Sequence, residues 1–72
     1  MAHSNDPTLQ YTLEQLIDQH GLDKVLHDIA YTCYAKADHV ATNWQDHTLA
    51  HTWEYVSNMV SRAAEHAGKA SL

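Results

Sequence analysis

The chain has 72 residues, four Lys and Arg against nine Asp and Glu, and a net charge of −5. This length allows one small domain with a marginal core, so a metal or a partner subunit is expected to complete it. The acidic balance argues against direct binding to nucleic acid, and the single cysteine excludes a disulfide within the chain.

Cysteine usage and hydropathy bear on the location of the protein. The lone thiol of Cys33 fits a reducing compartment. The chain shows neither a charged and apolar leader nor a run of 18 apolar residues. We therefore predict a cytoplasmic protein that does not enter a membrane.

The N-terminal residues 1–11 are mostly polar and are expected to form a flexible tail. An alternative is an extra helical turn that starts at Pro7, because proline suits the first position of a helix and Asp6 can cap it.

The first predicted helix spans about residues 12–20. Thr12 and Gln15 have the spacing of a capping box, and Gly21 is expected to end the helix in the left-handed conformation. The apolar face of this helix comprises Leu13, Leu16 and Ile17.

The longest apolar pattern predicts a central helix over about residues 23–42, capped by Asp23. Apolar residues recur along it at steps of three and four, forming a seam of Leu22, Leu26, Ile29, Cys33, Ala37, Val40 and Trp44. Cys33 lies in the middle of this seam and is expected to be a buried small hydrophobe. After the helix, Asn43 is expected to adopt the left-handed conformation, and Trp44 to pack over the end of the core.

A third helix is predicted over about residues 47–67, capped by Asp46 and ended by Gly68, which leaves residues 68–72 as a C-terminal tail. Its apolar seam comprises Leu49, Trp53, Val56, Val60, Ala63 and Ala67. Two long helices with a short link should pack antiparallel, with both seams facing inward. The sequence therefore predicts an all-α domain over residues 12–67, in which the short first helix closes one side of an antiparallel helical hairpin.

Three residues of the third helix form a candidate metal site. His47, His51 and Glu54 share one helical face, where two neutral imidazoles and a carboxylate can bind Zn²⁺ or Ni²⁺. The pattern is similar to the zincin motif, but Thr48 stands where that motif has its catalytic glutamate. The alternative is an ordinary solvated face, because these residues lie opposite the apolar seam.

A second stripe, on the central helix, is a candidate contact surface. It consists of His27, Tyr31, Tyr34 and Asp38, and Tyr55 on the third helix could extend it. Tyrosine combines a large apolar area with a polar tip and is enriched at interfaces. The alternative is that these aromatics cover the flank of the core. Acid–base catalysis by this stripe would need a pocket, which so small a domain offers little room to build, so we predict no enzymatic activity.

A set of positions spread over residues 12–54 supports a resemblance to known proteins: the run 12–26, Cys33, Lys36-Ala37, residues 43–46 and Trp53-Glu54. In these residues the chain resembles a group of short, uncharacterised helical proteins from bacteria and their phages. The resemblance implies a cytoplasmic or phage-borne accessory protein. It implies no activity and assigns no functional residue.

These observations predict a small non-enzymatic protein-binding or regulatory module, a bacterial or phage-borne accessory or inhibitor protein, that self-associates and needs no cofactor. The rival is a transition-metal-binding module built on the histidine pair. A further rival is a pH-responsive assembly, because protonation of all seven histidines would move the net charge from −5 to +2.

Overall fold

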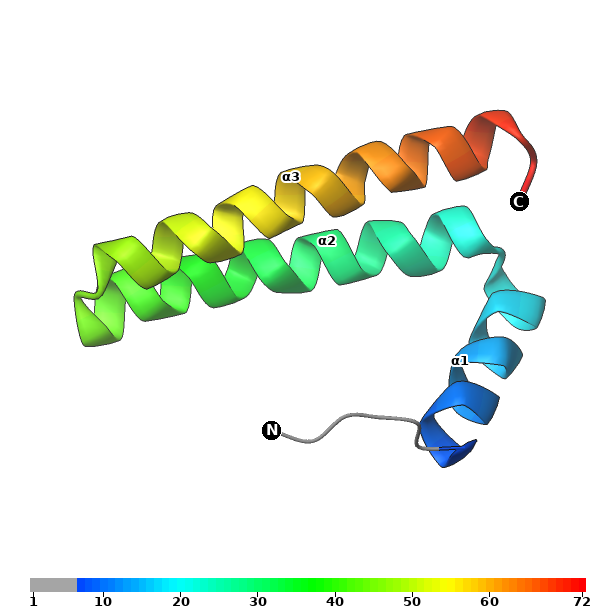
Figure 1. Cartoon of the computed structure of the whole chain (residues 1–72), viewed down its shortest axis with the longest axis horizontal. Coiled ribbons are helices and arrows are strands. Elements are labelled where there is room, and N and C mark those ends of the chain that lie inside the picture. The colour runs from blue at the N-terminus through cyan, green and yellow to red at the C-terminus, as the bar shows by residue number, and fades with distance from the viewer. Residues whose placement is uncertain (1–6) are drawn as a thin grey trace.

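The computed structural model describes residues 7–72, which form three α-helices and one π-helical turn (Figure 1). The described residues contain no strand. The predicted all-α fold is therefore confirmed. Of the flexible tail predicted for residues 1–11, residues 1–6 lie outside the described residues, and residues 7–11 are helical, so that part of the prediction is wrong.

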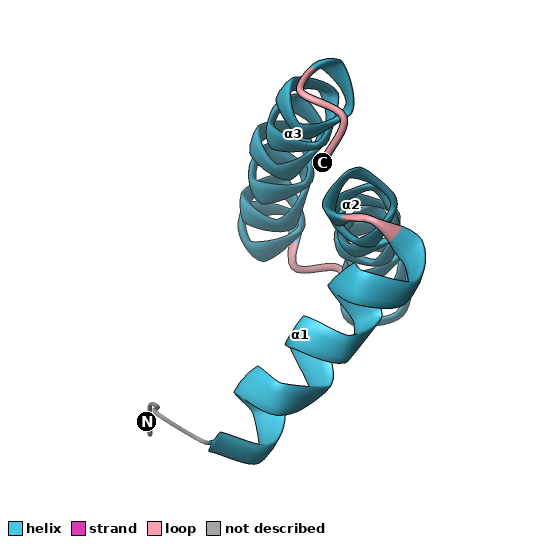
Figure 2. Cartoon of the chain, turned by 90° about the vertical axis from the view of Figure 1, so that its right-hand side faces the viewer, coloured by secondary structure: helices cyan, strands magenta, loops and turns pink. Residues whose placement is uncertain are grey.

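Two long helices form an antiparallel hairpin. α2 (Leu22–His39) and α3 (His47–Lys69) lie side by side over most of their length (Figures 1 and 2). α1 (Pro7–His20) turns sharply away from the end of α2, and its described backbone makes no close approach to α3. The hairpin was predicted correctly, but α1 stands off its side instead of closing it.

The first helix begins earlier than the capping-box pattern predicts. α1 starts at Pro7, where the missing N–H of proline costs no helical hydrogen bond. Thr12 is a helical residue, and its hydroxyl donates to the carbonyl of Thr8 over 2.9 Å. The predicted start at Thr12 is therefore wrong, and the alternative start at Pro7 is the one that the structure has.

A single glycine joins α1 to α2. Gly21 has φ 90° and ψ 148°, a backbone conformation that residues other than glycine rarely adopt. α2 starts at Leu22, whose N–H donates to the carbonyl of Leu72 at the other end of the chain. Asp23 therefore lies inside the first turn of α2, and the prediction that it caps this helix is wrong.

α2 continues into a π-helical turn, η1 (Val40–Trp44). A π turn spans one residue more than an α turn and so changes the direction of the side chains that follow. Trp44 consequently points outward and is 73% exposed, so the prediction that it covers the core is wrong. The left-handed residue is Gln45, with φ 54°, two positions beyond the predicted Asn43.

The start of α3 follows the prediction, and its end does not. The carboxylate of Asp46 accepts a hydrogen bond from the backbone N–H of Leu49 over 3.0 Å, which confirms Asp46 as the cap. Gly68, predicted to stop the helix, lies inside it, and α3 ends at Lys69.

Replacing Asp46 by alanine is expected to lower the free energy of unfolding by about 1 kcal/mol, because the N–H of Leu49 loses its partner. For a domain of this size the melting temperature should fall by about 4–8 °C. Asp38→Ala is the control, since it removes the same charge from an exposed helical position. Equal melting temperatures for the two variants would contradict the role of the cap.

The core between α2 and α3 is built from small side chains. The buried residues are Ala30, Cys33, Ala37, Ala50, Ser57, Ala64 and Ala67. Cys33 is buried, as predicted. On α3, however, the buried positions Ala50, Ser57 and Ala64 each lie one residue after the predicted Leu49, Val56 and Ala63, which are exposed.

Small side chains let the two helix axes come close together, and the larger apolar side chains then lie along the flanks of the contact. The Ser57 hydroxyl donates to the carbonyl of Ala30 over 2.8 Å, which joins α3 to α2. Within residues 7–72, no buried side-chain nitrogen or oxygen lacks a hydrogen-bond partner. On α2, the predicted seam is confirmed at Cys33 and Ala37, which are buried. On α3 the buried face is turned by about one residue from the predicted seam, apart from Ala67, which is buried as predicted.

None of the helices formed by residues 7–72 combines the length and the apolar character that crossing a bilayer requires.

Candidate protein-binding surfaces

The tyrosine stripe predicted on α2 is open to solvent. His27, Tyr31, Tyr34 and Asp38 follow one another at helical spacing and are all exposed. Tyr31 is 70% exposed and Tyr34 is 59% exposed, so neither ring covers the core. The stripe therefore presents two aromatic rings and two polar groups that a partner could contact.

Tyr55 is exposed but does not extend this stripe. It lies two residues from the buried Ser57, which turns it about 200° around α3 and onto the outer side of the hairpin. The structure thus brings together four of the five residues predicted to bind a partner and separates the fifth.

A hollow of about 400 Å³ lies between the two long helices at the His27 end of the stripe. Its walls are formed by Asp23, Lys24, His27, Ser61, Ala64 and Glu65. The hollow gives that end of the stripe both cationic and anionic groups, in contrast to the two tyrosines further along α2.

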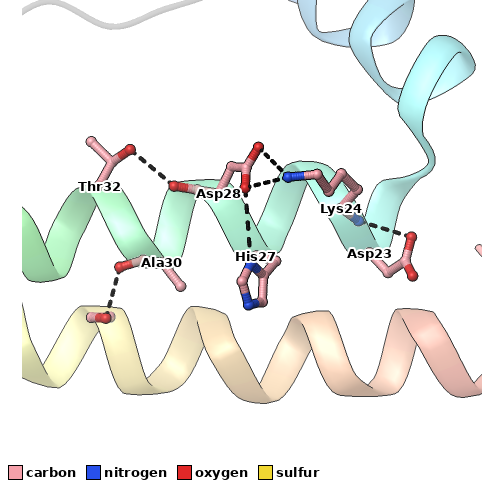
Figure 3. Close-up of polar contacts among 7 residues, drawn as sticks. Asp23, Lys24, His27, Asp28, Ala30 and Thr32 are labelled. Carbon is pink, nitrogen blue, oxygen red and sulfur yellow. Dashed lines mark hydrogen bonds and ion pairs between the residues drawn. The ribbon is translucent and has the colours of Figure 1, made fainter.

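An ion pair lies next to the hollow. The Lys24 Nζ is 2.8 and 2.9 Å from the two carboxylate oxygens of Asp28, and the His27 Nδ1 is 3.8 Å from one of them (Figure 3). The hydrogen bond from Lys24 holds the pKa of Asp28 below its ordinary value. Because both side chains are exposed, solvent and salt screen this pair, so it orders the surface more than it stabilises the fold.

The candidate metal site is only partly assembled. The His51 Nδ1 lies 3.7 Å from a carboxylate oxygen of Glu54, and both side chains are exposed. Among residues 7–72, no three His, Cys, Asp or Glu side chains are grouped closely enough to hold a metal ion. Zinc or nickel binding by His47, His51 and Glu54 stays a prediction, which elemental analysis of protein purified without a histidine tag would test.

A second surface is not evident from the sequence pattern. It is a groove of about 550 Å³ in the angle between α1 and α2. It is lined mainly by apolar atoms of Leu16, His20, Lys24, Val25, Asp28, Ile29, Thr32, Cys33, Lys36 and Trp53. The groove exists because α1 leaves the hairpin at the Gly21 joint, and the direction of that joint is not readable from periodicity.

One aromatic residue links the groove to α3. The Lys36 Nζ lies 5.6 Å from the centroid of the Trp53 ring, a cation–π contact between α2 and α3. On the α1 side of the groove, Leu9, Leu13 and Leu16 recur at helical spacing and are all exposed, and Leu16 belongs both to this stripe and to the groove wall. This leucine stripe of α1 and the groove are therefore neighbouring apolar surfaces, both uncovered.

Comparison of the chain with protein-family models, with curated proteins and with solved structures found no match. The surfaces themselves are of two kinds: a tyrosine stripe with charged neighbours on one side of the hairpin, and an apolar groove beside α1. Both are suited to contact with protein side chains.

Proposed function

We propose that this chain is a small, non-enzymatic protein-binding module that recognises its partner through the tyrosine stripe of α2. The observation that carries the proposal is the exposure of Tyr31 and Tyr34 on one face of a helix, between the polar side chains of His27 and Asp38. Paired aromatic rings with polar neighbours are typical of the central residues of protein interfaces.

The composition supports one biological setting over others. A short acidic chain with one thiol is suited to a regulatory or inhibitory role in the cytoplasm, as an accessory protein of bacterial or phage origin. Its acidity favours a protein partner over nucleic acid, because phosphate groups would be repelled. Self-association is part of this proposal, since so small a core gains stability from a partner subunit.

The test is capture of partners from an extract of the native host, followed by mass spectrometry. Tyr31→Ala/Tyr34→Ala should reduce the recovery of any specific partner at least about tenfold, as expected for aromatic residues at the centre of an interface. Tyr11→Ala is the matched control, because Tyr11 is equally exposed but lies on α1. Circular dichroism of each variant checks that the helices are intact.

Unchanged recovery by the double variant would contradict the proposal. Tyr55→Ala forms a separate arm: loss of capture there would place the interface on the outer side of α3 instead. A partner lost equally with Tyr11→Ala and with the double variant would point to non-specific aromatic binding, which also contradicts the proposal.

A further inference from the structure

We infer that the apolar groove between α1 and α2 binds a second copy of this chain, with the leucine stripe of each copy's α1 lying in the groove of the other. The inference rests on the proposed function, which includes self-association, because it states which surface the two copies use. It concerns a different surface from the tyrosine stripe. Leu9, Leu13 and Leu16 supply the stripe, and Ile29 and Trp53 lie in the groove.

The isolated chain exposes more surface than a compact protein of its mass. Its accessible area is 5735 Å², whereas a compact monomer of 8.1 kDa exposes about 4,500 Å². Residues 1–6 contribute at most about 1,000 Å², the area of six residues in an unfolded chain. Residues 7–72 therefore retain about 4,700 Å² or more, at least about 500 Å² above the value of about 4,200 Å² for a compact chain of their size.

The excess exposed area is similar to the area that each partner buries in a stable dimer. A stable dimer buries about 600–1,000 Å² on each partner, and the excess on this chain lies between about 500 and 1,200 Å². The exposed area is also of the right kind, since the leucine stripe and the groove wall are apolar. A second copy would bring the exposed surface back to the range of a compact protein.

The composition of the core gives a separate reason. Within residues 7–72, the largest buried hydrophobic residue is Cys33, and the others are alanines. Many large apolar side chains are exposed instead, among them the leucine stripe of α1 and Ile29 in the groove, whereas others such as Leu26 and Val60 are half-buried. Burial of the exposed side chains between two copies would supply the hydrophobic contribution that the hairpin core lacks.

The geometry suits a symmetric pair. In a two-fold interface the same patch is used by both copies, so a protruding element and its receptor must both be present on one chain. Here the protruding element is α1, which stands away from the hairpin (Figures 1 and 2). The receptor is the groove next to it. One rotation therefore buries two leucine stripes and two grooves together.

Analytical ultracentrifugation of the purified whole chain, from about 1 µM to 500 µM, tests self-association without any other protein. The expected result is a species of twice 8.1 kDa. Leu13→Lys and Ile29→Lys, on the stripe and in the groove, should each raise the dissociation constant at least about tenfold. Gln15→Lys and Ala35→Lys are the controls, because each adds the same charge to an exposed position of the same helix outside these surfaces.

Isotope-filtered NMR of the unaltered chain keeps the test decisive if a lysine variant unfolds. In a mixture of labelled and unlabelled chains, methyl groups of Leu13 in one copy should show contacts to Ile29 or Trp53 of the other. A chain that stays monomeric at 500 µM overturns the inference. A dimer whose contacts between copies involve only other residues, or a monomer in which residues 1–6 contact the groove, also overturns it.

The groove inference and partner recognition by the tyrosine stripe fail separately. A monomer whose partner capture still depends on Tyr31 and Tyr34 overturns the groove inference and the proposed self-association, and leaves partner recognition by the tyrosine stripe standing. A groove dimer whose capture is unaffected by the double tyrosine variant overturns the proposed function alone.

Discussion

Gly21→Ala is expected to lower the free energy of unfolding by about 2–3 kcal/mol. The glycine has φ 90° and ψ 148°, a backbone region that residues with a Cβ adopt only at a cost of about 1–3 kcal/mol. A Cβ there would also lie 3.0 Å from a carboxylate oxygen of Asp23 and 3.3 Å from the carbonyl oxygen of Leu72. For a domain of this size the melting temperature should fall by about 10–20 °C.

The other glycine of the chain provides a control of opposite sign. Gly68 is helical, and the nearest atom that a Cβ would meet is 3.6 Å away. Gly68→Ala should therefore raise stability, by up to about 1 kcal/mol, because alanine loses less backbone entropy in a helix. Thermal melts at one fixed protein concentration measure both changes. Destabilisation by both substitutions to the same extent would show that the Gly21 joint is not special.

Ala37→Leu is expected to destabilise the hairpin by about 3 kcal/mol, because it adds three carbon atoms where α2 and α3 touch. Ala37 is 2% exposed, and its neighbours across the contact are themselves packed. The helices must separate to accept the larger side chain, which would also strain the hydrogen bond from Ser57 to Ala30. Urea denaturation at fixed protein concentration measures the change.

Each helix of the hairpin carries a matched pair of alanines. Ala35 is exposed on α2, and Ala35→Leu should change stability by no more than about 0.5 kcal/mol. On α3, Ala64 is buried and Ala63 is exposed, so Ala64→Leu should be strongly destabilising and Ala63→Leu should not. If leucine were equally tolerated at all four positions, α2 and α3 would not be in close contact through these residues.

The helices and their antiparallel arrangement could be predicted from the sequence because each depends on local information. The three-and-four spacing of apolar residues defines the long helices, and the cap at Asp46 follows from its position before one of them. The short link between the long helices leaves little choice but an antiparallel hairpin. The tyrosine stripe could be predicted for the same reason, since its four residues follow one another at steps of four, three and four along one face of α2.

The orientation of the contact could not be predicted in this way. An apolar pattern favours the side with the largest side chains, such as Leu49 and Val56, whereas close helix contact selects the small residues Ala50 and Ser57. Both faces overlap on a helix, and only tertiary packing decides between them. The groove was missed for a related reason, because it depends on the direction that α1 takes after Gly21.

The spacing of small residues on α3 has a consequence for how the hairpin selects its alignment. Ala50, Ser57 and Ala64 are seven residues apart, so sliding α3 by two turns, about 10.5 Å, would place an equivalent surface against α2. The small side chains of this surface oppose such a shift only weakly, and the hydrogen bond from the Ser57 hydroxyl to Ala30 fixes just one position along it. The correct register is therefore enforced mainly by the two-residue connection 45–46, which is too short to span the displaced arrangement.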